Sequence, residues 1–128
     1  MISRTVLFSA VLLAVSAPSY GQIIELTHNE PFTGEKIFCV EVTGTLGKDD
    51  YPLIFILSLA DKDVPIKYLF NGRLMKDFTA DHEFKGRQKV PGTGKYWFTF
   101  VTSAKTTIRK FEVQGDSAEG SATLGRCT

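Results

Sequence analysis

The sequence predicts a domain of the α+β class that is dominated by β-strands, with about five strands and at most one short helix. Several segments are rich in β-branched and aromatic residues and alternate apolar with polar side chains, which is the period of a half-buried strand. Polar segments that contain glycine separate them. Only two segments show a helical pattern, and it is weak in both.

The first residues have the layout of a secretory signal peptide. Arg4 supplies a positive charge, an apolar run extends from Val6 to Val15, and Pro18 and small residues lead to Gly21. The run is about half of the ~20 apolar residues that span a bilayer, so a membrane anchor is the weaker interpretation. We expect residues 1–21 to be removed, and residues 22–128 to form a single domain that is secreted without a membrane anchor.

Five segments are predicted as strands, and one of them, residues 53–59, is apolar throughout and is expected to be buried on both faces. Residues 103–105 are short enough to join the last two strands as a hairpin. Residues 73–84 and 23–29 are the candidates for a helix, with a polar loop as the alternative for each. The predicted strands are residues 36–43, 53–59, 65–71, 95–102 and 106–114.

Cys39 and Cys127 are the two cysteines of the chain. Secretion follows an oxidising route, and an even number of cysteines there favours a disulfide. Two free thiols or a bridge between two copies are the alternatives. Closing a loop of this length is expected to stabilise the fold by about 4–5 kcal/mol in the chain-entropy model.

Charge and motifs argue against several functions. One of the 15 Lys and Arg residues is Arg4, so 14 remain after it against 14 Asp and Glu, and this balance disfavours strong binding to nucleic acid. His28 and His82 lie far apart among polar residues and are expected at the surface, not as metal ligands. No phosphate-binding glycine loop is present. We expect neither a metal nor a cofactor.

Three basic residues, Lys85, Arg87 and Lys89, alternate and would share one face of a strand. Together with nearby Tyr96 and Trp97 they could hold a single-stranded nucleotide. The favoured interpretation is an edge strand whose charges prevent aggregation. Because Tyr96 and Trp97 are adjacent on a predicted strand, only one of these rings can face a ligand on a given side of the sheet.

Several short motifs follow one another in the order of a known family. Cys39 lies near the expected mature N-terminus, Tyr51-Pro52 precedes an apolar strand, and residues 63–66 (DVPI) begin another. Residues 91–95 (PGTGK) lead into an aromatic strand, and residues 125–128 (GRCT) end the chain. In these motifs the chain resembles small guanyl-specific fungal ribonucleases and, more closely, the ribonuclease-like secreted effectors of powdery-mildew fungi. The resemblance implies a curved antiparallel sheet with its ends joined by the disulfide.

The resemblance also implies that catalysis has been lost. Leu53 stands where the ribonucleases have a first His, and residues 114–118 contain no second one, so a general acid is missing. We therefore expect a monomeric, non-catalytic effector (a virulence or avirulence protein) that is delivered into host cells, binds a host protein, and binds RNA weakly through a vestigial groove. The residues expected in that groove are Tyr51, Asp63 in place of a Glu, Lys95 in place of an Arg, and Tyr96.

A second class of function competes with the effector. Phe32, residues 70–73 (FNGR) and residues 113–116 (VQGD) resemble segments of galectins. This resemblance implies a secreted β-sandwich that binds carbohydrate. Two stacked sheets with a groove of the size of a sugar would favour it over the ribonuclease-like interpretation.

Overall fold

The computed structural model describes residues 23–44, 51–115 and 122–128, and these residues contain five strands and no helix. All pairings are antiparallel, in the strand order β3-β2-β4-β1-β5. The predicted mostly β, curved antiparallel sheet of about five strands is confirmed. The strands are β1 (Ile23–Thr43), β2 (Tyr51–Phe70), β3 (Arg73–Val90), β4 (Gly94–Gly115) and β5 (Thr123–Arg126).

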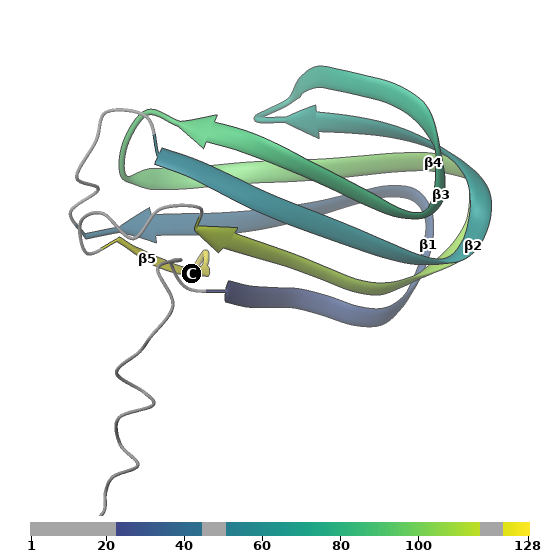
Figure 1. Cartoon of the computed structure of the whole chain (residues 1–128), viewed down its shortest axis with the longest axis horizontal. Helices are drawn as coiled ribbons and strands as arrows, with labels where there is room; N and C mark the ends of the chain where they lie inside the picture. Colours follow the sequence, from purple (N-terminus) through teal and green to yellow (C-terminus); the bar gives the residue numbers. More distant parts are fainter. Residues whose placement is uncertain (1–22, 45–50, 116–121) are drawn as a thin grey trace, which may run out of the picture.

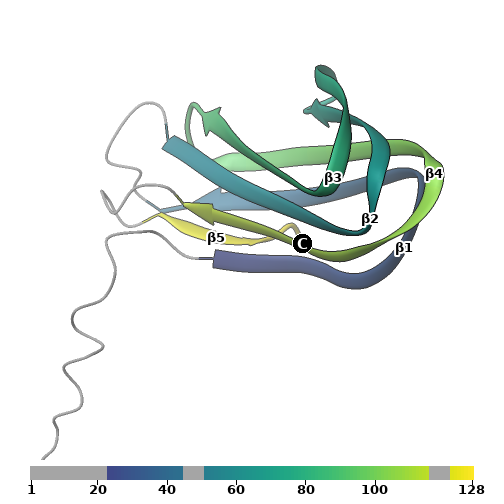
Figure 2. The same ribbon diagram turned by 45° about the vertical axis from the view of Figure 1, so that its right-hand side comes forward.

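The first four strands bend near their middles, so the single sheet folds back over itself (Figures 1 and 2). Its two halves face each other as the layers of a sandwich. We call them layer 1 and layer 2. Layer 1 consists of residues 23–32, 51–59, 83–90 and 106–115, and layer 2 consists of residues 34–43, 64–70, 73–80 and 94–102 together with β5.

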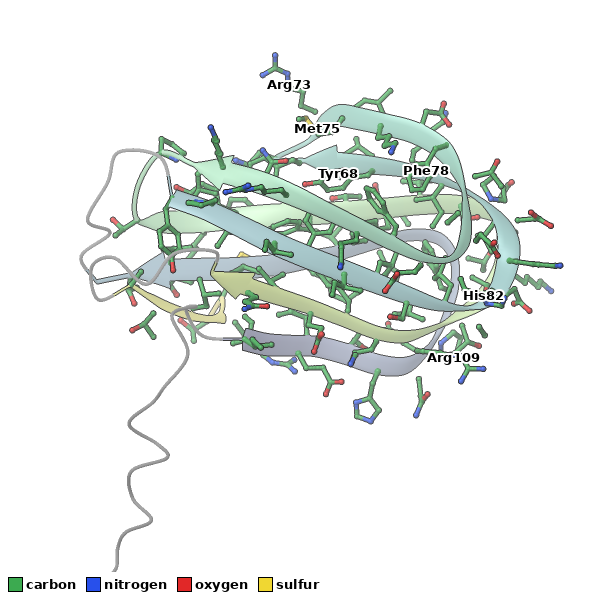
Figure 3. The ribbon with its side chains drawn as sticks, in the orientation of Figure 1. Tyr68, Arg73, Met75, Phe78, His82 and Arg109 are labelled. Atoms are coloured by element: carbon green, nitrogen blue, oxygen red, sulfur yellow. A yellow bond between two sulfur atoms is a disulfide. The ribbon has the colours of Figure 1, made fainter. Side chains whose placement is uncertain are left out.

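Residues with left-handed backbone conformations lie at the bends. Gly34, Asp63 and His82 have φ angles of 76°, 57° and 68°, and Gly, Asp and His adopt such angles more readily than most residues. Figure 3 shows His82 at the end of the sandwich where the strands turn. The ladders of β1 and β2 have register shifts in these regions, as expected for bulges that redirect a strand.

The bends explain where the sequence prediction of individual elements is wrong. Residues 53–59 and 65–70 belong to one strand, β2, and residues 103–105 continue β4 instead of forming a hairpin turn. An exposed bend inside a strand has the same polar pattern as a loop between strands. The helix candidates are strands as well: residues 73–84 lie in β3, where Phe78, Ala80 and Phe84 pack on the core, and residues 23–29 lie in β1.

Aromatic rings from both layers form the core. Phe55 of layer 1 packs on Phe98 of layer 2 with ring centroids 5.4 Å apart, and Phe111 packs on Phe100 at 5.1 Å. All four side chains are buried. The Phe55 ring also reaches the backbone of β3 at Gly86, where a Cβ atom would lie 2.4 Å from its Cζ atom. Only glycine fits this contact without a shift of the ring.

The predicted disulfide between Cys39 and Cys127 is present, with the Cα atoms 5.5 Å apart. It connects β1 to the residue that follows β5, and β5 itself pairs with residues 40–43 of β1. The Arg126 side chain donates a hydrogen bond to the carbonyl oxygen of Glu25 at 2.8 Å. The C-terminal segment is therefore fixed to β1 in both layers. A disulfide of this kind is consistent with an extracellular protein.

The predicted signal peptide, residues 1–21, lies outside the described residues, so secretion stays a prediction. Within the described ranges, no helix is long and apolar enough to cross a membrane.

Candidate functional site

The outer face of layer 2 carries an exposed tryptophan. Trp97, the single tryptophan of the sequence, lies on β4 and is 43% exposed. Its neighbour Tyr96 is 7% exposed, and its hydroxyl donates a hydrogen bond to the carbonyl oxygen of Gly92 at 2.6 Å. The alternation of the strand thus turns Trp97 toward solvent and Tyr96 toward the core.

The backbone of Trp97 is held on both sides. Its N–H donates to Oδ1 of Asn71 at 2.9 Å, and its carbonyl oxygen accepts from the backbone N–H of Asn71 at 2.9 Å. Asn71 and Gly72 have φ angles of 51° and 80°, the two positive angles of a type I′ turn, and this turn joins β2 to β3. On the other side, Trp97 lies opposite the disulfide-bonded Cys39. The indole therefore stands on a rigid backbone.

An open hollow of about 690 Å³ extends from the indole across three strands. Ile37 of β1 and Leu69 of β2 both pair with Thr99 of β4, so these residues form a row beside Trp97. Ile37 is 55% exposed and adds apolar surface, while Glu35 adds a carboxylate. We call this surface the Trp97 face. Its residues are Glu35, Ile37, Leu69, Asn71, Gly72, Trp97 and Thr99.

The structure does not assemble the four residues expected in an RNA groove. Tyr51 and Tyr96 are buried in the core, at 2% and 7% exposure. Asp63 lies at the bend of β2, where it adopts the left-handed backbone conformation of the bend. Lys95 lies at the start of β4, and its Nζ atom is 3.4 Å from the carbonyl oxygen of Thr128. Buried rings and a bend residue cannot line an open groove together.

The three alternating basic residues, Lys85, Arg87 and Lys89, are exposed on β3. β3 lies at the edge of the sheet, with β2 as its neighbour. Charges at such a position oppose pairing with the edge of another sheet. They lie in layer 1, whereas the Trp97 face belongs to layer 2.

Among the described residues, two titratable groups have shifted pKa values, and neither lines the hollow at Trp97. Hydrogen bonds from Lys36 and Thr27 lower the pKa of Glu30, which lies 2.7 Å from the Lys36 ammonium. Burial raises the pKa of Tyr68. In the part of the chain that the structure describes, no group of three His, Cys, Asp or Glu side chains could hold a metal ion.

No protein-family model and no curated protein matches the chain. Among solved structures, the chain is similar to a family 35 carbohydrate-binding module from an environmental isolate, with 11% identity over 88% of this chain and 96% of that chain and a TM-score of 0.49. It is also similar to CBM35 from Cellvibrio japonicus Abf62, with 9% identity over 86% of this chain and 93% of that chain and a TM-score of 0.46. Likenesses of this strength say nothing about a ligand.

The predicted resemblance to fungal ribonucleases and their effector relatives is wrong. The described strands form an all-β sandwich without a helix, instead of a ribonuclease-like α+β fold. The motifs that suggested the resemblance have structural roles here. Residues 63–66 contain the bend of β2, and the carbonyl oxygen of Gly92 accepts a hydrogen bond from the Tyr96 hydroxyl. The predicted role as a ribonuclease-like effector falls with the resemblance.

Proposed function

We propose that the protein is a non-catalytic carbohydrate-binding protein and that a sugar ring packs on the Trp97 face. The observation that carries this proposal is the exposed indole of Trp97 on a rigid sheet surface. One face of a pyranose ring is a set of polarised C–H groups, and these pack favourably on the negative face of an aromatic ring. Ile37 and Leu69 extend the apolar platform on which the sugar would lie.

The polar groups around the indole suit the hydroxyl groups at the edge of a sugar. The carboxylate of Glu35 accepts hydrogen bonds. The side-chain oxygen of Asn71 already accepts the Trp97 N–H, which leaves the amide nitrogen of Asn71 as a donor. A few fixed polar groups around an apolar platform are typical of small-ligand sites. Their attachment to a clamped backbone lowers the entropy lost on binding.

The charge of the Trp97 face favours a neutral sugar over a nucleic acid. Among the described residues, its lining includes the carboxylate of Glu35 and no Lys or Arg. Binding to phosphates relies on basic side chains, whereas the charged side chain that lines the hollow, in the part of the chain that the structure describes, is the carboxylate of Glu35. We therefore expect neutral glycans as ligands and no strong affinity for RNA.

Affinity electrophoresis through gels that contain soluble neutral polysaccharides tests this proposal. We expect at least one polysaccharide to retard the native protein and Trp97→Ala to migrate as in a gel without sugar. Ile23→Ala is the matched control, because Ile23 is also an exposed apolar residue but lies in layer 1. It should be retarded like the native protein.

Fluorescence gives a second measurement, because Trp97 is the single tryptophan of the chain. Oligosaccharides of the retarding polysaccharide should shift its emission in a saturable way. If no polysaccharide retards the protein, or if Trp97→Ala is retarded equally, the proposal is wrong.

A further inference from the structure

A groove of about 250 Å³ opens between the two layers at the edge formed by β3. It is separate from the Trp97 face, which lies on the outside of layer 2. Figure 3 shows Met75 and Tyr68 on this side of the molecule. The residues that line the groove are Phe55, Tyr68, Met75, Lys76, Phe84, Lys85, Gly86, Arg87 and Gln88.

Three aromatic rings form the floor of this edge groove. The ring centroid of Phe84 lies 5.2 Å from that of Phe55 and 5.6 Å from that of Tyr68, and Phe55 and Tyr68 are 4.9 Å apart. The Phe55 ring is 1% exposed and lies directly beneath Gly86, where it occupies the space that a Cβ atom would take. The floor therefore suits a flat, apolar ligand.

The polar groups of the edge groove are hydrogen-bond donors. The Tyr68 hydroxyl donates to Oε1 of Gln88 at 3.0 Å, which engages the acceptor of that amide and leaves its N–H groups as donors. The ammonium of Lys76 lies 4.9 Å from the centroid of the Phe78 ring and 5.6 Å from that of Phe84, so it stands directly beside the aromatic floor. Lys85 adds positive charge, and no Asp or Glu among the described residues lines the groove.

Donors and positive charge beside an aromatic floor are complementary to an anion on a flat apolar body. We propose that the edge groove binds a small aromatic carboxylate. The ligand ring packs on the exposed Met75 side chain and on the part of Phe84 that lines the groove, and its carboxylate accepts hydrogen bonds from Lys76 and Gln88. Hydrogen bonds between two charged groups are the stronger ones, so Lys76 supplies most of the selectivity for an acid. This site does not depend on sugar binding at Trp97.

Isothermal titration of the purified protein with phenylacetate tests the proposal, with phenylacetamide as the uncharged ligand of the same shape. We expect saturable binding of phenylacetate. The affinity for phenylacetamide should be lower by a factor of about ten or more, because a charge-assisted hydrogen bond is lost. Equal affinities, or no saturable binding of phenylacetate, would overturn the proposal.

Lys76→Met keeps the length of the side chain and removes its charge, and Lys76 is exposed, so the fold should tolerate the change. We expect it to weaken phenylacetate binding about tenfold or more. Lys105→Met is the matched control, since Lys105 is an exposed lysine at the bend of β4. An equal loss in both variants would show a general charge effect and refute the site.

Trp97→Ala separates the two proposed sites. It should leave phenylacetate binding unchanged while it abolishes retardation by polysaccharide. Loss of phenylacetate binding in this variant would place the ligand on the Trp97 face and refute the edge groove, whereas loss of polysaccharide binding alone would leave the groove intact.

Discussion

The two edges of the sheet are stabilised in opposite ways. The edge at β1 is covered by β5 over residues 40–43 and is joined to the residue after β5 through the disulfide between Cys39 and Cys127. The edge at β3 has no strand beyond it among the described residues, and it carries exposed charges and the close contact of Gly86 with Phe55. The covalent link therefore protects the edge beside Trp97, while the edge with the groove depends on packing and charge.

Removal of the disulfide should have the largest effect on this difference. Cys39→Ser combined with Cys127→Ser should lower the free energy of unfolding by about 4 kcal/mol, because the unfolded chain gains the freedom of a loop closed over 88 positions. Urea denaturation measures the change. As a control, the native protein in reducing agent should show the same free energy of unfolding as the double variant. A loss below about 1 kcal/mol would show that β5 holds the edge without the bond.

The second effect concerns the β3 edge. Gly86→Ala should lower the free energy of unfolding by about 2 kcal/mol, because the new Cβ atom would overlap the Phe55 ring. Gly92→Ala is the matched control, since a Cβ atom at Gly92 would meet no atom within 4 Å, and its effect should stay within about 0.5 kcal/mol. Equal effects in the two variants would contradict a tight contact at this edge.

Tyr68→Phe should lower the free energy of unfolding by about 1 kcal/mol, since the hydrogen bond to Gln88 is lost. The pKa of Tyr68 is raised by burial, so the folded protein keeps a proton that the unfolded chain releases above its ordinary pKa of 10.0. The native protein therefore loses stability as the pH rises above that value. In Tyr68→Phe this loss should be smaller. Denaturation at pH 9 and at about pH 11 tests this, and equal losses in both proteins would contradict it.

The smallest effect is expected at the Glu30–Lys36 ion pair of β1. Because the pKa of Glu30 is lowered in the folded state, the pair contributes stability above the ordinary value of 4.5 and loses it as the pH falls. Both side chains are about a third exposed, so Lys36→Met should cost no more than about 0.5 kcal/mol at pH 7. Thermal unfolding at pH 7 and at about pH 3 should show a difference that disappears in acid. A difference that persists in acid would indicate lost packing of the Lys36 stem.

The strand character of β2, of β4 and of residues 36–43 could be predicted from the local pattern, and the disulfide from the residue count. Residues 23–29, residues 73–84 and β5 were not predicted as strands. The bends could not be predicted, since an exposed bend at Asp63 or at residues 103–105 has the composition of a loop. Whether two short strands or one long bent strand results is decided by the packing of the two layers.

The candidate site could be predicted only in part from the sequence. The adjacency of Tyr96 and Trp97 showed that one ring must face outward, but not which of them. The pattern that could have decided this is the alternation of Lys95, Trp97 and Thr99 with Tyr96, Phe98 and Phe100, which places the tryptophan on the face with the polar residues. The bonds from Asn71, by contrast, arise from a turn that lies 26 positions away in the chain and has no local pattern at Trp97.

The pairing of β1 with β4 has a consequence for how the chain is made. Ile23 of β1 lies opposite Gln114 of β4, so β1 leaves the ribosome first but cannot pair until β4 has been synthesised. The β2–β3 hairpin is local and has the Asn71-Gly72 turn, so we expect it to form early, and β1 to dock late and slowly. Cys39 stays apart from Cys127 until that docking. The oxidation of this pair would then mark the end of folding, and any delay would leave the thiol of Cys39 open to partners in neighbouring nascent chains.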